Sequence, residues 1–131
     1  PMQWDETEFA GFSETKPWLP VHRNRETVNV LAQSSNESSL LYMTRCLLKI
    51  RAAYPALRHG TYENIDVGNG YVLAFKRELD GERYYVVVNF ADQPQYFTLP
   101  ENCEVVITSS MTMTSAYDSI DGHQGVLYKA V

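Results

Sequence analysis

The feature that most constrains this fold is a series of short β-forming segments that fills the second half of the chain. Residues 84–90 are β-branched or aromatic apart from one asparagine, which is typical of a central strand buried on both faces of a sheet. Residues 71–76 place Tyr, Leu and Phe at every second position, the period of a strand. Asp80-Gly81 lies between the two segments and favours a two-residue hairpin turn. Together they predict two adjacent antiparallel strands.

Further short strands are predicted at 95–99, 104–108 and 126–130, with glycine and proline in the turns between them. The polar run 108–115 is interpreted as a loop. Six or more short strands with tight turns indicate an antiparallel β-sandwich. The sequence therefore predicts a mainly β fold, with a Greek-key-like C-terminal β-domain at residues 57–131.

One amphipathic helix is predicted before the strands, at about 34–54. Its apolar face recurs at spacings of 3, 4, 3 and 4 and consists of Leu40, Met43, Leu47, Ile50 and Tyr54, widened by Leu41 and Leu48. The expected N-cap is Ser34, Ser35 or Asn36. Glu37 is expected in the first turn, where the helix dipole favours an anion, and Pro55 is expected to end the helix.

The first 33 residues show neither a helical nor a strand period, so a long irregular segment is predicted at 1–33. Their large apolar residues are scattered: Trp4, Phe9, Phe12, Trp18, Leu19 and Val21. Aromatic side chains are costly to leave in water. We therefore expect them, and the apolar face of the helix, to pack against something that this chain does not contain. The segment and the helix form the first part of the chain, residues 1–56.

Charge and composition limit the partners. The 131 residues carry a net charge of −5, from 11 basic and 16 acidic side chains. Neither half has a basic patch, so we expect no binding to nucleic acid and none to an anionic membrane surface. No secretory signal pattern is visible, and a cytoplasmic protein is expected. Because the chain begins with Pro1 and not with Met, we expect it to be part of a longer protein.

Groups able to carry chemistry are sparse. The three histidines and two cysteines share no metal-ligand spacing: His22, His59, His123, Cys46 and Cys103. No metal or cofactor is therefore expected. Asp5, Glu6 and Glu8 cluster, and paired carboxylates hydrolyse glycosides when they face each other across a site. Three acids in an irregular segment are more typical of a solvated turn, and we assign no catalytic residue in this chain.

Short motifs follow one another along the chain in a fixed order. The opening reads Pro1-Met2-Gln3-Trp4-Asp5, followed by Ala10-Gly11-Phe12-Ser13 and Lys16-Pro17-Trp18-Leu19-Pro20-Val21. Later come Ile50-Arg51, Pro55-Ala56-Leu57, Gly60-Thr61-Tyr62, Ala74-Phe75-Lys76-Arg77 and Val87-Val88-Asn89-Phe90. In this order they resemble the oligo-1,6-glucosidase and α-glucosidase branch of the α-amylase family, glycoside hydrolase family 13. The resemblance runs from residue 1 to about 99, and the opening motif is the most specific.

The resemblance implies the end of a (β/α)₈ barrel followed by an antiparallel domain. The family cleaves α-glucosidic bonds with retention, using an Asp nucleophile, a Glu acid/base and a second Asp at the ends of earlier barrel strands. These would all precede Pro1, so the resemblance implies a fragment that stabilises the barrel and is inactive alone. Its partners would be the missing barrel and, through the parent enzyme, an oligosaccharide. Gln3 and Trp4 would border the substrate entrance.

A second hypothesis is a free-standing carbohydrate-binding or interaction module built on the β-sandwich. Its exposed aromatic rings would stack on sugars, on a platform formed by Tyr62, Tyr71, Tyr84 and Tyr96. Alternation along strands places aromatic residues in sheet cores just as readily. The exposure of these four rings separates the two hypotheses.

Overall fold

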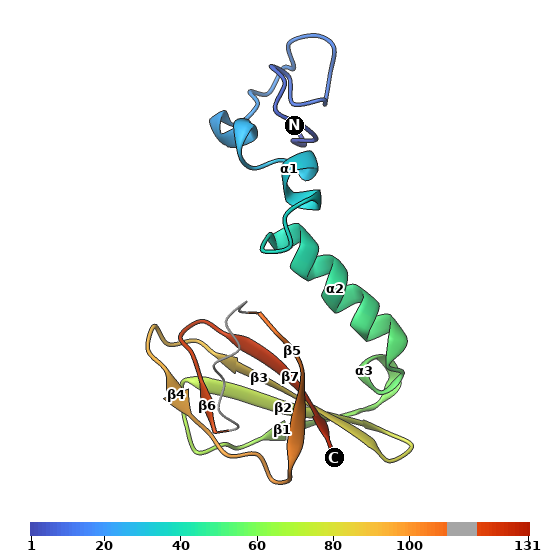
Figure 1. Cartoon of the computed structure of the whole chain (residues 1–131), viewed down its shortest axis with the longest axis vertical. Coiled ribbons are helices and arrows are strands. Elements are labelled where there is room, and N and C mark those ends of the chain that lie inside the picture. The colour runs from blue at the N-terminus through green and yellow to red at the C-terminus, as the bar shows by residue number, and fades with distance from the viewer. Residues whose placement is uncertain (110–117) are drawn as a thin grey trace. The chain divides into compact units, whose positions relative to one another are not determined.

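The computed structural model of the chain describes residues 1–109 and 118–131 (Figure 1). These residues form two compact units, Pro1–Lys49 and Ile50–Val131, and each is described by itself. Most of the run interpreted as a loop, 108–115, lies outside the described residues. Over the part that the structure describes, no helix is long and apolar enough to cross a membrane.

Two short helices interrupt the first 33 residues, which the sequence predicts to be irregular throughout. They are the 3₁₀-helix η1 (Arg23–Glu26) and the helix α1 (Val30–Ser34). The buried Asn29 caps α1, because its Oδ1 accepts a hydrogen bond from the Ala32 N–H at 2.7 Å. A helix of five residues is too short to show an apolar period, so the pattern misses it.

The predicted amphipathic helix is α2 (Leu40–Ala53), and it begins later than expected. Ser39 caps it, because the Ser39 Oγ accepts from the Tyr42 N–H at 3.1 Å. A second free N–H, that of Leu41, donates to Oε1 of Gln33 at 3.1 Å. The expected cap and first-turn residues all lie before the helix: Ser34, Ser35, Asn36 and Glu37.

A further short helix, α3 (Ala56–His59), lies where the sequence predicts the β-domain to begin. Pro55 ends α2 as predicted, and its fixed φ, here −55°, also suits the first turn of α3. The amide of Gly60 closes α3 by donating to the Ala56 carbonyl at 3.0 Å. The domain boundary between residues 56 and 57 stays a prediction.

The β-domain has two antiparallel sheets. The larger has the strand order β1-β2-β3-β7-β5 and the smaller pairs β4 with β6. The strands are β1 (Thr61–Ile65), β2 (Val72–Leu79), β3 (Glu82–Asn89), β4 (Gln95–Tyr96), β5 (Cys103–Thr108), β6 (Ser119–Ile120) and β7 (Gly125–Ala130). The prediction misses β1 and β6, and only two of the residues in 95–99 are in a strand. The mainly β antiparallel fold class is confirmed.

The β2–β3 hairpin is formed as the sequence predicts. Leu79 pairs with Glu82, and the two residues between them, Asp80 and Gly81, have φ of 51° and 84°. Two successive positive φ values are the mark of a type I′ turn, the turn that matches the twist of a two-residue hairpin. The Asp-Gly dipeptide therefore fixes the register of the two central strands.

The larger sheet is covered on both faces, with β3 at its centre. On one face Tyr85 and Val87 pack with Phe97 and Ile120, which come from the neighbourhood of the smaller sheet. On the other face Tyr84 packs against α3 and the end of α2 through Ala56, Leu57, Ile50 and Tyr54. Tyr84 and Tyr85 are both fully buried, so the prediction of a strand buried on both faces is confirmed.

Candidate functional site

The two residues expected near a substrate entrance, Gln3 and Trp4, hold the start of α1 through their backbone. The Gln3 carbonyl accepts from the Val30 N–H and the Trp4 carbonyl from the Leu31 N–H, each at 3.0 Å. The first N–H groups of a helix have no partner within it. The opening motif therefore positions α1 by supplying the acceptors that this helix lacks.

The side chain of Gln3 is held by hydrogen bonds, whereas that of Trp4 is largely exposed to solvent. The Gln3 Nε2 donates to the Asn24 Oδ1 at 3.2 Å and to the Val28 carbonyl, so its amide is held in place. The Trp4 ring is 51% exposed. Of the two, Gln3 has the defined orientation and Trp4 offers an open apolar surface.

A hollow of about 340 Å³ lies beside Gln3 in the first unit. It is lined by Pro1, Met2, Gln3, Val28, Asn29, Val30, Gln33 and Leu41. Its polar side chains are the amides of Gln3, Asn29 and Gln33, which form hydrogen bonds within the unit. Amides cannot act as general acid, general base or nucleophile. The hollow therefore has no side chain that could cleave a glycosidic bond.

The acidic cluster at the N-terminus forms a turn. One Asp5 oxygen accepts from the Thr7 N–H at 2.9 Å and from the Thr7 hydroxyl at 2.6 Å. These hydrogen bonds lower the pKa of Asp5, and the bond from the Thr7 hydroxyl has the larger effect. Gly11 lies next to this carboxylate and has a positive φ of +62°. A Cβ at this position would be only 2.6 Å from the other Asp5 oxygen. Asp5 thus has the structural role expected of a solvated turn.

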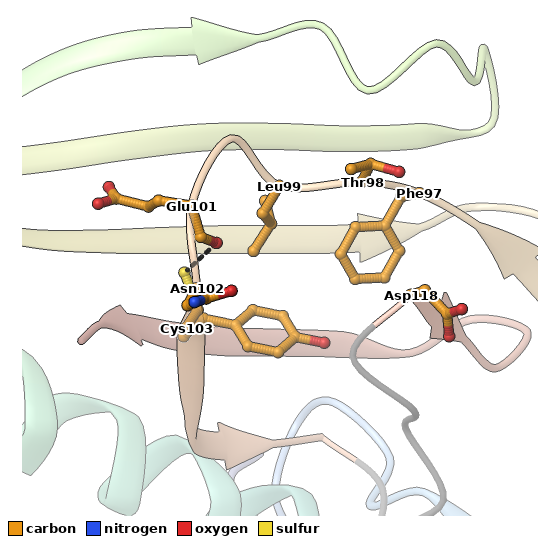
Figure 2. Close-up of a pocket in the computed structure, with 8 residues that line it drawn as sticks. Phe97, Thr98, Leu99, Glu101, Asn102, Cys103 and Asp118 are labelled. Atoms are coloured by element: carbon orange, nitrogen blue, oxygen red, sulfur yellow. Dashed lines mark hydrogen bonds between the residues drawn. The ribbon is translucent and has the colours of Figure 1, made fainter.

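A second hollow, of about 390 Å³, lies in the β-domain (Figure 2). Its lining residues are Phe97, Thr98, Leu99, Glu101, Asn102, Cys103, Asp118 and Tyr128. Figure 2 shows the carboxylate of Glu101 directed away from Phe97 and Asp118. The thiol of Cys103 donates to the Glu101 carbonyl at 3.5 Å, and burial raises its pKa. A buried thiol with a raised pKa is a poor nucleophile.

The carboxylate of Glu101, in the segment before β5, binds two side chains of β3. Arg83 donates to its two oxygens from Nε and Nη2, each at 2.8 Å, and the Tyr85 hydroxyl donates at 2.5 Å. The Arg83 contact, followed by that of Tyr85, lowers the pKa of Glu101. Burial, followed by the bond to Glu101, raises the pKa of Tyr85. The arrangement fastens the segment before β5 to β3 and is structural. The alternating pattern of residues 83–87 in the sequence does not predict these contacts with Glu101.

Replacement of Glu101 by Gln is expected to lower the free energy of unfolding by about 1 kcal/mol at neutral pH, because one charged acceptor is lost on a partly exposed site. The pKa of Glu101 is lowered in the folded state, so its carboxylate stabilises the folded protein at pH values above its unfolded pKa. This stabilisation is lost as the pH falls through the folded-state pKa. The difference from the unchanged protein should therefore shrink in acid. Urea unfolding at neutral and acid pH measures it. Glu104→Gln, at an exposed position, is the control; an equal difference at both pH values would contradict the expectation.

Two of the histidines each contact one polar side chain. The His123 Nε2 is 2.6 Å from an Asp92 oxygen in two exposed turns, and the His22 Nδ1 is 2.6 Å from the Asn24 Oδ1. Among the described residues, no group of three or more His, Cys, Asp or Glu side chains is placed to hold a metal ion.

Two family descriptions match adjoining parts of the chain. Residues 1–60 match the catalytic domain of α-amylase, and residues 62–122 match the C-terminal domain of maltogenic amylase. The junction falls where α3 gives way to β1. The chain belongs to the α-amylase family of glycosidases, glycoside hydrolase family 13, and carries a C-terminal domain of that family.

The similar proteins indicate the branch within that family. The chain is 31% identical to an oligo-1,6-glucosidase of Parageobacillus thermoglucosidasius and 35% identical to one of Halalkalibacterium halodurans, each over 118 residues and 21% of the relative. It is 38% identical to the trehalulose synthase MutB of Pseudomonas mesoacidophila MX-45, with a TM-score of 0.89 over 25% of that chain. The resemblance to the oligo-1,6-glucosidase and α-glucosidase branch is confirmed. The chain spans about a fifth to a quarter of the length of these relatives.

Proposed function

We propose that this chain is the C-terminal part of a retaining α-glucosidase that acts on the α-glucosidic bonds of oligosaccharides. The observation that carries the proposal is the continuous match of one chain to a catalytic domain and then a C-terminal domain of the same family. The relatives named oligo-1,6-glucosidase support the substrate class. A cytoplasmic location belongs to the same proposal.

The role of the chain in that enzyme is to complete and stabilise the barrel. Helix α2 has no buried residue, and Leu40, Leu47 and Leu48 on its apolar side are exposed. Trp18 is 90% exposed, and Phe12 is about half exposed. Apolar surface of this kind favours burial against another protein surface. The barrel of the parent enzyme is the partner that accounts for it.

The chemistry of the reaction belongs to the barrel of the parent enzyme. Retaining glycosidases need two carboxyl groups about 5 to 5.5 Å apart on either side of the bond that is cleaved. The hollow beside Gln3 is lined by amides and apolar side chains, and Asp5 is committed to its turn. We therefore propose that the chain is inactive alone and that Gln3 and Trp4 border the substrate entrance of the parent.

A chimera tests this function. The chain is fused to the oligo-1,6-glucosidase of Parageobacillus thermoglucosidasius in place of the segment with which it aligns, and hydrolysis of p-nitrophenyl-α-glucoside is measured. We expect activity from the chimera and none above the buffer blank from the 131-residue chain or from the truncated relative. Turnover by the chain alone would overturn its inactivity, and a soluble but inactive chimera would overturn the proposed function.

The four tyrosines of the alternative, a carbohydrate-binding module, do not form one platform. Tyr84 is fully buried, which removes it from any platform. Tyr62 is 61% exposed, and its ring packs on Phe75 with centroids 5.2 Å apart. Tyr71 and Tyr96 are also exposed, whereas their neighbours Val72 and Phe97 lie in the core between the sheets. The described residues therefore favour the parent-enzyme function.

A further inference from the structure

The loop between β1 and β2 contains the one asparagine of this chain that is followed by glycine, Asn69-Gly70. The side chain of an asparagine is open to attack by the backbone nitrogen of the next residue, which forms a five-membered succinimide ring and releases the side-chain amide as ammonia. A glycine in the next position has no side chain to obstruct this attack. A Cβ on Gly70 would have no neighbour within 4 Å, so the surrounding loop leaves the site open as well.

The side-chain carbonyl of Asn69 is held against a hydrogen-bond donor. Its Oδ1 accepts from the Tyr71 N–H at 3.0 Å, in the Asx turn that asparagine favours in loops. Attack on the side-chain carbon places negative charge on this same oxygen, and a fixed N–H donor stabilises such a charge. The Gly70 N–H, which is the attacking group, forms no hydrogen bond among residues 1–109 and 118–131. The loop thus presents a polarised carbonyl next to an uncommitted nitrogen.

The leaving group of the same side chain is restrained by the smaller sheet. The Asn69 Nδ2 donates to Oε1 of Gln95 at 2.9 Å and to the carbonyl of Tyr96 at 3.1 Å. Both acceptors belong to β4, a strand of only two residues. Short surface elements with few hydrogen bonds open locally at a low cost in free energy. These contacts therefore delay the loss of the amide but do not prevent it.

We propose that Asn69 is a site of spontaneous deamidation and that its contacts with β4 set the rate. Hydroxide takes the proton of the Gly70 N–H, the nitrogen attacks the side-chain carbon of Asn69, and the bond from that carbon to Nδ2 breaks. The departing nitrogen takes a proton from water and leaves as ammonia. Water then opens the succinimide at either carbonyl, which gives aspartate or isoaspartate at position 69. This inference does not depend on the proposed function.

The modification changes the contact between the β1–β2 loop and the smaller sheet. The Nδ2 donor is replaced by a carboxylate oxygen that faces the Tyr96 carbonyl, and two acceptors at this distance form no hydrogen bond. The Gln95 side chain is free to turn its amide toward the new charge, but the backbone carbonyl is not. Deamidation therefore loosens β4 from the loop and adds one negative charge to a chain whose net charge is already −5.

Incubation of the full 131-residue chain in mildly alkaline buffer tests the proposal. Peptide mass spectrometry detects the mass gained when an amide becomes an acid, and chromatography separates the aspartate and isoaspartate peptides. We expect the peptide with Asn69 to be converted and the peptide with Asn64, which is exposed but followed by Ile65, to stay unchanged. Gly70→Ala should react at least tenfold more slowly, because its methyl group obstructs the attack.

A second comparison tests the control of the rate by β4. The unchanged chain should react at least tenfold more slowly when folded than in urea, where the contacts of Asn69 are absent. Gln95→Leu removes one acceptor of the leaving amide, so its folded-state rate should lie between these two. Gln93→Leu, at an exposed position two residues earlier, is the matched control and should react like the unchanged chain.

Each outcome supports or overturns one part of the proposal. An intact Asn69 in the folded chain, under conditions that convert it in urea, overturns the modification site. Equal conversion of Asn64 and Asn69 also overturns it, since the glycine would then have no effect. Equal rates in the folded and urea-unfolded chain, or in Gln95→Leu and Gln93→Leu, overturn the control by β4.

Discussion

Asn89→Asp is expected to lower the free energy of unfolding by about 3 to 5 kcal/mol at neutral pH, although the two side chains have nearly the same shape. Asn89 is 1% exposed at the end of β3. Its Nδ2 faces the carbonyls of Gln93, Asp121 and Ile120 at 2.9, 3.0 and 3.3 Å. Aspartate replaces this donor with a charged oxygen facing three acceptors, a buried charge without a partner.

The loss in Asn89→Asp should depend on pH with a defined sign. Burial among carbonyls favours the neutral acid, so the introduced carboxyl has a folded-state pKa raised above its unfolded value of about 4. Protonated, it can donate one hydrogen bond. The penalty is therefore smallest below the unfolded pKa and grows as pH rises through the folded pKa.

Urea unfolding across this pH range measures both effects. Asn64→Asp, at an exposed position on the edge strand β1, is the matched control and should stay within about 0.5 kcal/mol of the unchanged protein. A loss for Asn89→Asp as small as that of the control would show that the amide contacts do not hold this end of the sandwich.

The amide of Asn89 also shows where prediction from sequence stops. Asn in a run of β-branched residues indicates only the end of a strand. Its importance comes from the carbonyl of Gln93, just after β3, and from those of Ile120 and Asp121, which the chain brings to Asn89 only on folding. The buried Gln124, which donates to the Thr108 hydroxyl at 2.7 Å, is of the same kind.

The sequence predicts those strands of the sheet whose residues alternate regularly between apolar and polar or are apolar throughout. The β2–β3 hairpin follows from alternation and from Asp80-Gly81, both of which are local. Strand β1 was missed because it is polar and exposed along the sheet edge. Its side chains are stabilised across strands instead, as in the ion pair of Glu63 with Lys76 at 2.8 Å. A polar edge strand carries no apolar pattern for the sequence to reveal.

The helix and the candidate site show the same limit. The apolar face of α2 was visible as a period, but its start depends on Ser39 and on the side chain of Gln33, which reaches forward to the Leu41 N–H. Gln3 and Trp4 were singled out through the resemblance alone. Their backbone contacts with α1 join residues distant in sequence, and no local rule predicts such contacts.

Gly60→Ala is expected to lower the free energy of unfolding by about 3 kcal/mol, because the backbone leaves no room for a Cβ. A Cβ on Gly60 would lie 2.5 Å from the Ala56 carbonyl oxygen and 2.7 Å from the Glu78 carbonyl oxygen. Both neighbours are backbone atoms, one in α3 and the other in β2, so neither can rotate away. The clash can be relieved only by moving α3 off the sheet.

The matched control is Gly70→Ala, where a Cβ would have no neighbour within 4 Å and where φ is not positive. It should not destabilise the fold and should stabilise it by up to about 1 kcal/mol, since it reduces the backbone freedom of the unfolded chain at an open position. Urea unfolding of both variants tests the steric cost, and heat inactivation of both chimeras tests its consequence for the enzyme. Because α3 joins catalytic-domain sequence to the sheet, Gly60→Ala should also shorten the half-life of the active chimera, about tenfold or more. Equal half-lives for the two variants would show that the seating of α3 does not hold the two domains together.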